Sequence, residues 1–151
     1  MKVKNFCKRE PVTVRSADEL VVAARLMREQ HVGYLVVVEP AVREGTFVPV
    51  GVITDRDIVV GVIARDIDPR TLRVEDVMTR EPVLADEDES LGGALKKMRK
   101  VGVRRLPVVG FQNELVGVLA IDDILDAVVG ELQDAAGAIR KEQSIEISLR
   151  P

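Results

Sequence analysis

A hydroxyl and a carboxylate, three residues apart, follow an apolar run at Gly51-Val52-Ile53-Thr54-Asp55-Arg56-Asp57. A carboxylate such as that of Asp57 can accept two hydrogen bonds from a vicinal diol, and free N–H groups at the start of a helix attract phosphate. A threonine followed three residues later by an acid is also a variant of the capping box, which is purely structural. The spacing alone leaves both interpretations open.

The motif recurs later in the chain as Gly117-Val118-Leu119-Ala120-Ile121-Asp122-Asp123. The glycine, the apolar pair and the last aspartate are kept, and Ala120 replaces Thr54. Because Ala120 has no side-chain acceptor and cannot cap a helix, Asp123 is not kept only to complete a capping box. The recurrence therefore favours Thr54, Asp57 and Asp123 as ligand-binding residues.

The two motifs lie in two halves that repeat one another. Residues 3–38 align with residues 74–109, including Arg9-Glu10-Pro11-Val12 against Arg80-Glu81-Pro82-Val83, and the first half carries a short insertion within about residues 39–49. A repeat of this length indicates one supersecondary unit used twice. We expect a first domain at 3–65, a linker at 66–73, a second domain at 74–130 and a helical or extended tail at 131–151.

Apolar periodicity assigns a β-α-β-β-α order to each half. In the first half we expect strands at 12–14, 34–38 and 47–54, a helix that begins at the capping box Ser16-Ala17-Asp18-Glu19, and a helix at 55–64. The apolar face of the first helix is Leu20, Ala23, Ala24 and Met27, and the second helix is expected to bury Ile58, Val59, Val62 and Ile63.

The second half follows the same order. Its helix face is Leu91, Ala94, Leu95 and Met98, its strands are 106–109 and 115–119 around a turn at Gln112-Asn113, and its last helix contains Ile124, Leu125, Val128 and Val129. Residues 132–139 continue that helix or begin another one. The alternation of Ser144 to Leu149 is compatible with a terminal strand, which would need a partner edge.

Composition excludes several classes of function. Aromatic residues make up 3% of the 151 residues, and the formal net charge is −3, so no nucleic-acid partner is expected. No segment reaches the roughly 18 apolar residues of a membrane span, and the polar start lacks a signal-peptide core, so we expect a cytoplasmic protein without a membrane partner. Cys7 aligns with Met78 and is interpreted as a small core residue.

The residues for catalysis are also missing from the sequence. A single histidine, His31, cannot form a multi-histidine metal site and is interpreted as a residue that ends the first helix. The sequence shows no Ser/His/Asp set and no phosphate-cradling glycine loop. We therefore expect no enzyme activity, no catalytic or metal-binding residues and no required cofactor.

The chain resembles a tandem pair of cystathionine-β-synthase (CBS) domains, an arrangement called a Bateman module. The resemblance is carried by Val74-Glu75-Asp76-Val77-Met78-Thr79 before Pro82, by Met98, by Val103 to Val109 and by Gly117 to Asp123, with Val32 to Val38 and Gly51 to Asp57 as the first-half equivalents. It implies an α+β fold of two pseudo-symmetric units, with sheets packed together, helices outside and a C-terminal tail.

The same resemblance implies two clefts that take adenosine-containing ligands such as AMP, ADP, ATP or S-adenosylmethionine, in a module that regulates rather than catalyses. The family pattern places the hydroxyl of Thr54 against phosphate and the carboxylates of Asp57 and Asp123 against ribose. It also suggests that Arg104 and Arg105, which precede the strand at 106–109, contact a ligand phosphate.

The repeat equivalents of Arg104 and Arg105 are Gly33 and Tyr34, which carry no charge. If each half supplies its own hydroxyl and its own strand-start residues to one cleft, the Thr54 cleft has a hydroxyl without arginines. The cleft of Asp123 then has arginines without a hydroxyl. We therefore expect two unequal clefts that differ in affinity or in ligand.

Three functions remain open from the sequence. The first is a regulatory adenosine-ligand sensor that forms a homodimer through helices 55–64 and 124–132 and acts on an unknown client protein. The second is an interaction or dimerisation protein with vestigial clefts, in which the tail is the working part. The third and weakest is nucleotide hydrolysis, for which no base or metal set is apparent.

Overall fold

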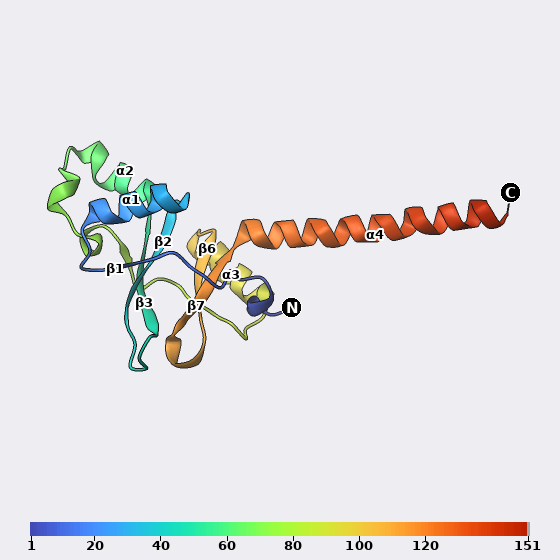
Figure 1. Cartoon of the computed structure of the whole chain (residues 1–151), viewed down its shortest axis with the longest axis horizontal. Coiled ribbons are helices and arrows are strands. Elements are labelled where there is room, and N and C mark those ends of the chain that lie inside the picture. The colour runs from blue at the N-terminus through green and yellow to red at the C-terminus, as the bar shows by residue number, and fades with distance from the viewer. Residues whose placement is uncertain (151) are drawn as a thin grey trace.

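The computed structural model describes residues 1–150 as two small sheets flanked by helices and followed by one long helix (Figure 1). The elements of the first half are β1 (Thr13–Arg15), α1 (Leu20–Gln30), β2 (Tyr34–Pro40), β3 (Phe47–Thr54) and α2 (Asp55–Gly61). Those of the second half are β4 (Thr79–Arg80), β5 (Ala85–Asp86), α3 (Leu91–Val101), β6 (Arg105–Val109), β7 (Leu115–Ala120) and α4 (Ile121–Leu149). Short 3-10 turns span Val3–Asn5, Ile63–Arg65, Pro69–Thr71, Val74–Asp76 and Phe111–Asn113.

The two sheets repeat one pattern, which confirms the predicted α+β fold of two pseudo-symmetric units. In the first sheet the order is β1-β2-β3-β4, with β1 parallel to β2 and the other pairs antiparallel. In the second the order is β5-β6-β7, again with a parallel pair followed by an antiparallel pair. Even the register shifts correspond, at Val37/Val38 in β2 and at Val108/Val109 in β6.

The segment that precedes each sheet packs on the other half of the molecule. Thr79 of β4 pairs with Val52 of β3, and Val74 is buried in the first core. At the N-terminus, Lys8 bridges Val118 of β7, and Val3 is buried in the second core. Each hydrophobic core is therefore completed by a segment that the repeat assigns to the other half, and Cys7 packs against the second core as a small apolar residue.

The helices α1 and α3 cover the sheets with apolar faces close to those predicted. Three residues of each are buried, at equivalent positions: Leu20, Ala23 and Met27 in α1, and Leu91, Ala94 and Met98 in α3. Ala24 is exposed, so its assignment to the apolar face was wrong. These faces follow from the spacing of the apolar residues along a helix of 3.6 residues per turn.

The capping box predicted at Ser16 is also wrong. Helix α1 begins at Leu20, and its N-cap residue Glu19 makes no side-chain capping hydrogen bond. The hydroxyl of Ser16 instead donates to the carboxylate of Glu39 on β2. The second half has no Ser-x-x-Glu pattern at the equivalent position. Ser90 nevertheless caps α3, because its hydroxyl accepts a hydrogen bond from the backbone N–H of Gly93 at 3.0 Å. Tertiary contacts thus decide which serine acts as a cap.

Helix α2 and the start of α4 are less buried than their composition suggests. Val62 is buried after α2, but Val59 and Ile63, which were expected inside, are 56% and 53% exposed. In α4 only Ile124 of the four predicted residues is buried, and Leu125, Val128 and Val129 are exposed. The other apolar residues of these two helices, Val59, Ile63, Leu125, Val128 and Val129, therefore find little cover within residues 1–150 of a single chain.

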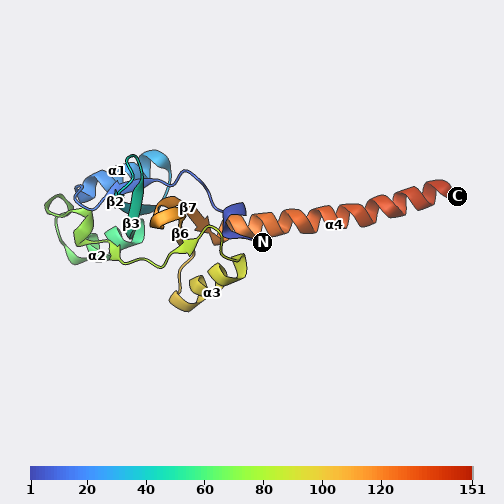
Figure 2. The ribbon, with the colours of Figure 1, turned by 90° about the horizontal axis from the view of Figure 1, so that it is seen from below.

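The tail is a continuation of α4 and not a strand. The helix runs without a break from Ile121 to Leu149, so the strand predicted at Ser144 to Leu149 was wrong. A helix satisfies its backbone hydrogen bonds within the segment, whereas a lone strand needs a neighbouring edge. Figures 1 and 2 show α4 projecting away from the body in both views. Within the described residues, no helix is both long and apolar enough to span a membrane.

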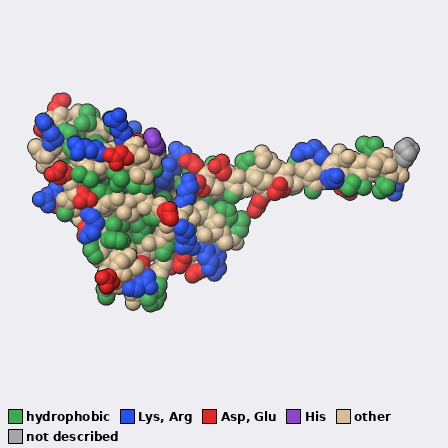
Figure 3. All heavy atoms as spheres, in the orientation of Figure 1, with side chains coloured by type: hydrophobic (Ala, Val, Ile, Leu, Met, Phe, Trp, Pro, Cys, Tyr) green, Lys and Arg blue, Asp and Glu red, His purple; other side chains and the backbone are tan. Residues whose placement is uncertain are grey.

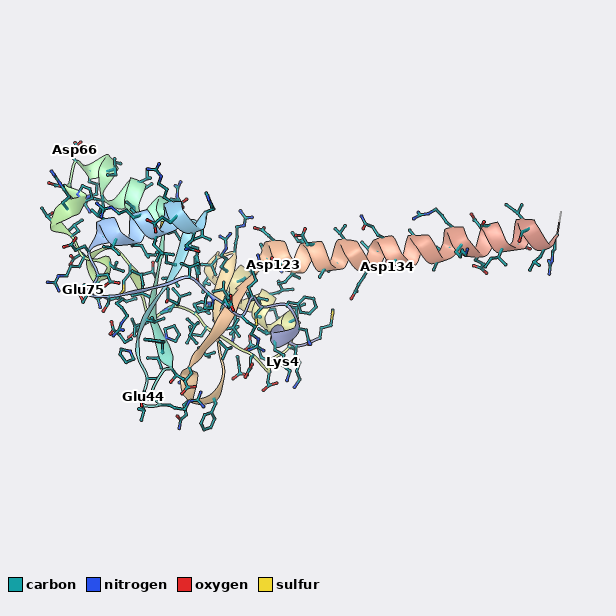
Figure 4. The ribbon with its side chains drawn as sticks, in the orientation of Figure 1. Lys4, Glu44, Asp66, Glu75, Asp123 and Asp134 are labelled. Carbon is teal, nitrogen blue, oxygen red and sulfur yellow. The ribbon has the colours of Figure 1, made fainter. Side chains whose placement is uncertain are left out.

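The insertion in the first half joins the two hairpins. Arg43 and Thr46, in the β2–β3 connection, both bond to the carboxylate of Glu114, which follows the 3-10 turn between β6 and β7. Glu114 is 4% exposed although it is charged. The two hairpin ends lie side by side in Figure 1, and Figure 4 labels Glu44 at the tip of the first. The insertion thus holds the two halves together at the end farthest from α1 and α2.

Candidate functional site

Thr54 and Asp57 form a reciprocal capping box at the start of α2. The backbone N–H of Asp57 donates to Thr54 Oγ1 at 3.1 Å, and the backbone N–H of Thr54 donates to Asp57 Oδ2 at 2.8 Å. The structural interpretation of this spacing is therefore realised. A hydroxyl in this role keeps its own proton and a lone pair, and the carboxylate keeps a second oxygen. The same two side chains can thus cap the helix and bind a ligand.

The larger cleft at this motif, called here the Thr54 cleft, has a volume of about 670 Å³. It brings Thr54 and Asp57 together with Arg104 and Arg105, so the expectation that the hydroxyl and the arginines lie in different clefts is wrong. Its other lining residues are Gly33, Tyr34, Val52, Asp55, Arg56, Thr79, Glu81, Pro82, Val83, Val101, Gly102, Val103, Leu106 and Pro107.

The second cleft, called here the Asp123 cleft, has a volume of about 350 Å³. It combines Ala120 and Asp123 of the second motif with His31 to Tyr34 of the first half. Asp123 Oδ1 lies 3.1 Å from Lys8 Nζ. The remaining lining residues are Glu10, Pro11, Val12, Arg105, Val118 and Asp122. His31 ends α1 as predicted, and it also lies at this cleft.

Each cleft therefore combines the motif of one half with the strand-start residues of the other half. The expectation that each half supplies both its motif and its strand-start residues to one cleft is wrong, because the two sheets pack with pseudo-two-fold symmetry. This packing turns the start of β6 toward the end of β3, and the start of β2 toward the end of β7. The Thr54 cleft consequently holds Thr54, Asp57 and both arginines, whereas of the two arginines the Asp123 cleft is lined only by Arg105.

Tyr34 and Arg105 form a wall that both clefts share. They occupy equivalent positions of the repeat, and the guanidinium of Arg105 lies 5.7 Å from the centroid of the Tyr34 ring. The hydroxyl of Tyr34 is buried and has no hydrogen-bond partner among residues 1–150, and burial raises the pKa of Tyr34. A buried polar atom without a partner is uncommon and fits a site where a ligand or water completes the bonding.

The carboxylate of Asp122 lies against both arginines. Arg104 Nη2 donates to Asp122 Oδ1 at 2.7 Å, and Arg105 Nη2 lies 3.9 Å from Asp122 Oδ2. All three side chains are substantially exposed, so these ion pairs are weak. An anionic ligand can therefore displace Asp122 at small energetic cost.

The glycine of each motif allows another strand to come close. A Cβ atom on Gly117 would lie 2.4 Å from the carbonyl oxygen of Lys8, and one on Gly51 would lie 2.9 Å from the carbonyl oxygen of Thr79. Lys8 and Thr79 belong to the two segments that each pack on the opposite half, and these glycines let the segments reach the clefts. Sequence reasoning missed this contribution. The repeated Arg-Glu-Pro-Val signal directly follows Lys8 and Thr79 and could have marked both segments.

Chemically, the clefts offer carboxylates, cations and hydroxyls, among them that of Thr54. Among residues 1–150, no group of three or more His, Cys, Asp or Glu side chains is placed to hold an ion. The arrangement can therefore bind a ligand that carries a diol and an anionic group.

Comparison with known proteins agrees with this architecture. A family model of the CBS domain matches residues 3–63 and 74–130. The CBS domain-containing protein YhcV of Bacillus subtilis is 36% identical over 122 residues, which are 81% of each chain. The uncharacterized protein MK0525 of Methanopyrus kandleri is 30% identical over 125 residues, but the match spans only 61% of that protein.

Solved structures show the same fold. The CBS domain protein PAE2072 from Pyrobaculum aerophilum, complexed with AMP, matches with a TM-score of 0.73 and 26% identity, over 89% of this chain and 99% of that one. The CBS domain pair of protein MJ0100, in complex with 5′-methylthioadenosine and S-adenosyl-L-methionine, gives 0.72 and 27%, over 87% and 98%. A hexameric CBS-CP12 protein from bloom-forming cyanobacteria gives 0.70 and 27%, over 83% and 66%.

Proposed function

The chain belongs to the CBS domain family, and on that basis we propose that it is a non-catalytic regulatory module that binds adenosine-containing ligands in the Thr54 and Asp123 clefts. The observation that carries the proposal is the convergence of Thr54, Asp57, Arg104 and Arg105 on one cleft from opposite halves of the chain. Solved relatives that hold AMP or S-adenosyl-L-methionine support it.

In this proposal the Thr54 cleft takes a nucleotide with a 5′-phosphate. The carboxylate of Asp57 accepts hydrogen bonds from the ribose hydroxyls through the oxygen that the helix cap does not use. The hydroxyl of Thr54 donates a hydrogen bond to the phosphate, and Arg104 and Arg105 bind the phosphate through charge-assisted hydrogen bonds. Bidentate arginine contacts of this kind favour phosphate over neutral groups.

The Asp123 cleft takes a ligand with less negative charge. Ala120 offers no hydroxyl, and Glu10, Asp122 and Asp123 outnumber the cations Lys8 and Arg105 at this cleft. Asp123 binds the ribose, as Asp57 does in the other cleft. A neutral nucleoside, or the cationic sulfonium of S-adenosylmethionine, fits this lining better than a triphosphate does.

The two clefts compete for Arg105, because this side chain lines both. A phosphorylated ligand that binds Arg105 in the Thr54 cleft removes it from the Asp123 cleft. We therefore expect one phosphorylated ligand to bind tightly per chain. A regulatory module needs different affinities for the ligand in two states, and movement of Arg105 against Tyr34 supplies a local change that a homodimer can pass to a client protein.

Calorimetric titration with AMP, ADP, ATP, S-adenosylmethionine and adenosine tests the proposal. Asp57→Ala should weaken AMP binding at least tenfold, since a hydrogen bond to a charged group contributes about 1.5–3 kcal/mol. Asp123→Ala should weaken the second, less anionic ligand instead. Arg104→Ala should weaken AMP binding but leave adenosine binding unchanged.

The matched control is Asp134→Ala, which removes an exposed carboxylate from α4 far from either cleft (Figure 4). It should bind every ligand as the wild type does. Because Asp57 also caps α2, thermal unfolding of each variant must show that it is folded at the titration temperature. Two equal sites, or unchanged binding in both aspartate variants, would contradict the proposal.

One observation favours the second function, an interaction protein with vestigial clefts. No residue from 131 to 150 is buried, although this part of α4 carries several large apolar side chains. If no adenosine ligand shifts the unfolding temperature, and the chain still forms a defined oligomer that depends on residues 132–151, this function replaces the first.

A further inference from the structure

The projecting part of α4 carries an apolar face that the rest of residues 1–150 leaves uncovered. Leu132 and Ile139 are 64% and 58% exposed, and both views show the helix standing clear of the body. Most of the stability of helices in proteins comes from packing an apolar face against another surface. The residues that form this face indicate what covers it.

The apolar residues of α4 are arranged symmetrically about Leu132. Going toward either end from Leu132, apolar residues stand three, four and seven positions away, which places them on one side of a helix. On the N-terminal side these are Val129, Val128 and Leu125, and on the C-terminal side they are Ala135, Ala136 and Ile139. The set Leu125, Val128, Val129, Leu132, Ala135, Ala136 and Ile139 is called here the α4 stripe.

We infer that the α4 stripe binds the α4 stripe of a second copy of this chain, with the two helices antiparallel and Leu132 on the two-fold axis. In this register Leu125 meets the partner's Ile139. On the two flanks, Val128 faces the partner's Ala135 and Val129 faces the partner's Ala136, so a larger side chain faces a smaller one. This alternation lets the helices approach closely and fill the space between them.

The charges on α4 distinguish the antiparallel from the parallel arrangement. The first 19 residues of the helix, Ile121 to Ile139, contain five acidic side chains and no basic one: Asp122, Asp123, Asp126, Glu131 and Asp134. The bases Arg140 and Lys141 follow directly. Figure 3 shows acidic side chains near the body and basic ones farther out along the helix. A parallel pair would place the acidic segments against each other, and like charges on facing helices repel.

The antiparallel register instead brings a base to the acidic segment. With Leu132 on the axis, Arg140 lies level with the partner's Ile124, between the partner's Asp122 and Asp126. Arg140 is five whole turns from Asp122 at 3.6 residues per turn, so both stand on the same flank of the stripe. In an antiparallel pair equal flanks face one another. Shape and charge thus select the same occupant, a second copy in one orientation.

This inference specifies a surface for the proposed homodimer but does not depend on ligand binding. A chain that binds AMP yet stays monomeric would overturn the inference and leave the proposed ligand function intact. A chain that pairs through α4 without binding any adenosine ligand would do the reverse. The two proposals therefore fail separately.

Sedimentation of the full-length chain over a range of concentrations is the first test. Leu132→Asp places a charge on the axis and should raise the dissociation constant of the dimer at least a hundredfold. Ile145→Asp is the matched control, because Ile145 is an exposed residue of the same helix outside the stripe. It should dimerise as the wild type does. A monomeric wild type, or equal effects of the two substitutions, would overturn the inference.

Orientation is tested by disulfide formation in a Cys7→Ser background, which removes the native thiol. Leu132→Cys should link to its own copy. Leu125→Cys and Ile139→Cys should each fail to do so alone but should link when differently tagged chains are mixed. Linking of Leu125→Cys to itself would show a parallel pair and overturn the assignment. Arg140→Glu should weaken the dimer, and adding Asp126→Lys should restore it.

Discussion

Replacing Arg43 by alanine should destabilise the protein although Arg43 is 61% exposed in side-chain surface. Its guanidinium bonds to Glu114, a carboxylate that is almost fully buried between the two hairpin ends. In Arg43→Ala the carboxylate keeps only the hydrogen bond from Thr46 Oγ1, at 3.0 Å. A buried charge that loses its partner cannot regain full hydration without moving the hairpins apart.

The size of the effect follows from these contacts. Removing one partner of a fully buried ion pair costs about 3–5 kcal/mol, and a single hydrogen bond to a charged group contributes about 1.5–3 kcal/mol. Because Arg43 itself is largely hydrated, water can replace part of its contact with Glu114. The cost of the substitution should therefore lie at the lower end of these ranges. We expect a loss of about 2 kcal/mol, which corresponds to about 4–8 °C in Tm for a chain of this size.

Urea unfolding followed by circular dichroism measures the loss directly. The matched control is Arg70→Ala, which also removes an arginine from an ion pair, but here Arg70 and Asp68 are 81% and 44% exposed. Solvent screens an exposed pair of this kind, so this variant should unfold close to the wild type. If the two variants lose the same stability, the insertion does not hold the halves together through Glu114.

Two further substitutions test other contacts. Gly117→Ala should weaken ligand binding in the Asp123 cleft and lower Tm, because its Cβ would stand 2.4 Å from the Lys8 carbonyl oxygen and push the Lys8 segment away. Calorimetry measures both effects, and the control is Gly130→Ala, where a Cβ has no neighbour within 4 Å. Ser16→Ala should reduce the dependence of stability on pH. The hydrogen bond from the Ser16 hydroxyl is the main cause of the lowered pKa of Glu39. The stability that this bond contributes is therefore present above the pKa of Glu39 in the unfolded chain, about 4.3, and is lost as pH falls through the pKa of Glu39 in the folded protein. Equal slopes of unfolding free energy against pH in the wild type and Ser16→Ala would contradict this account.

The elements and their repeat could be predicted because they depend on local patterns. The run from Phe47 to Thr54 is a strand with the expected bounds, and the apolar face of α3 is buried as its spacing indicates. The turn at Gln112 and Asn113 is also confirmed, with both residues in the left-handed region. In each case residues close in sequence carry the information, since periodicity and turn preference act over a few residues.

Misassigned features depended on contacts between distant residues. Ser16 has the sequence of a helix cap but bonds to Glu39, which lies on a neighbouring strand. Val59 stands at helical spacing yet is exposed, because spacing defines an apolar face but not what covers it. The terminal alternation around Ile145 and Ile147 became helix, since an unpaired strand there has no edge to satisfy its backbone.

For the site, the sequence by itself indicated the candidate residues: the repeat points to Thr54, Asp57 and Asp123, and the family resemblance adds Arg104 and Arg105. Only the tertiary structure decided how they are grouped. The pseudo-two-fold packing sets Arg104 and Arg105 against the motif of the other half, and it brings Lys8 and Thr79 close to the motif glycines Gly117 and Gly51. A repeat specifies two equal units, but the contacts between those units determine which halves build each cleft.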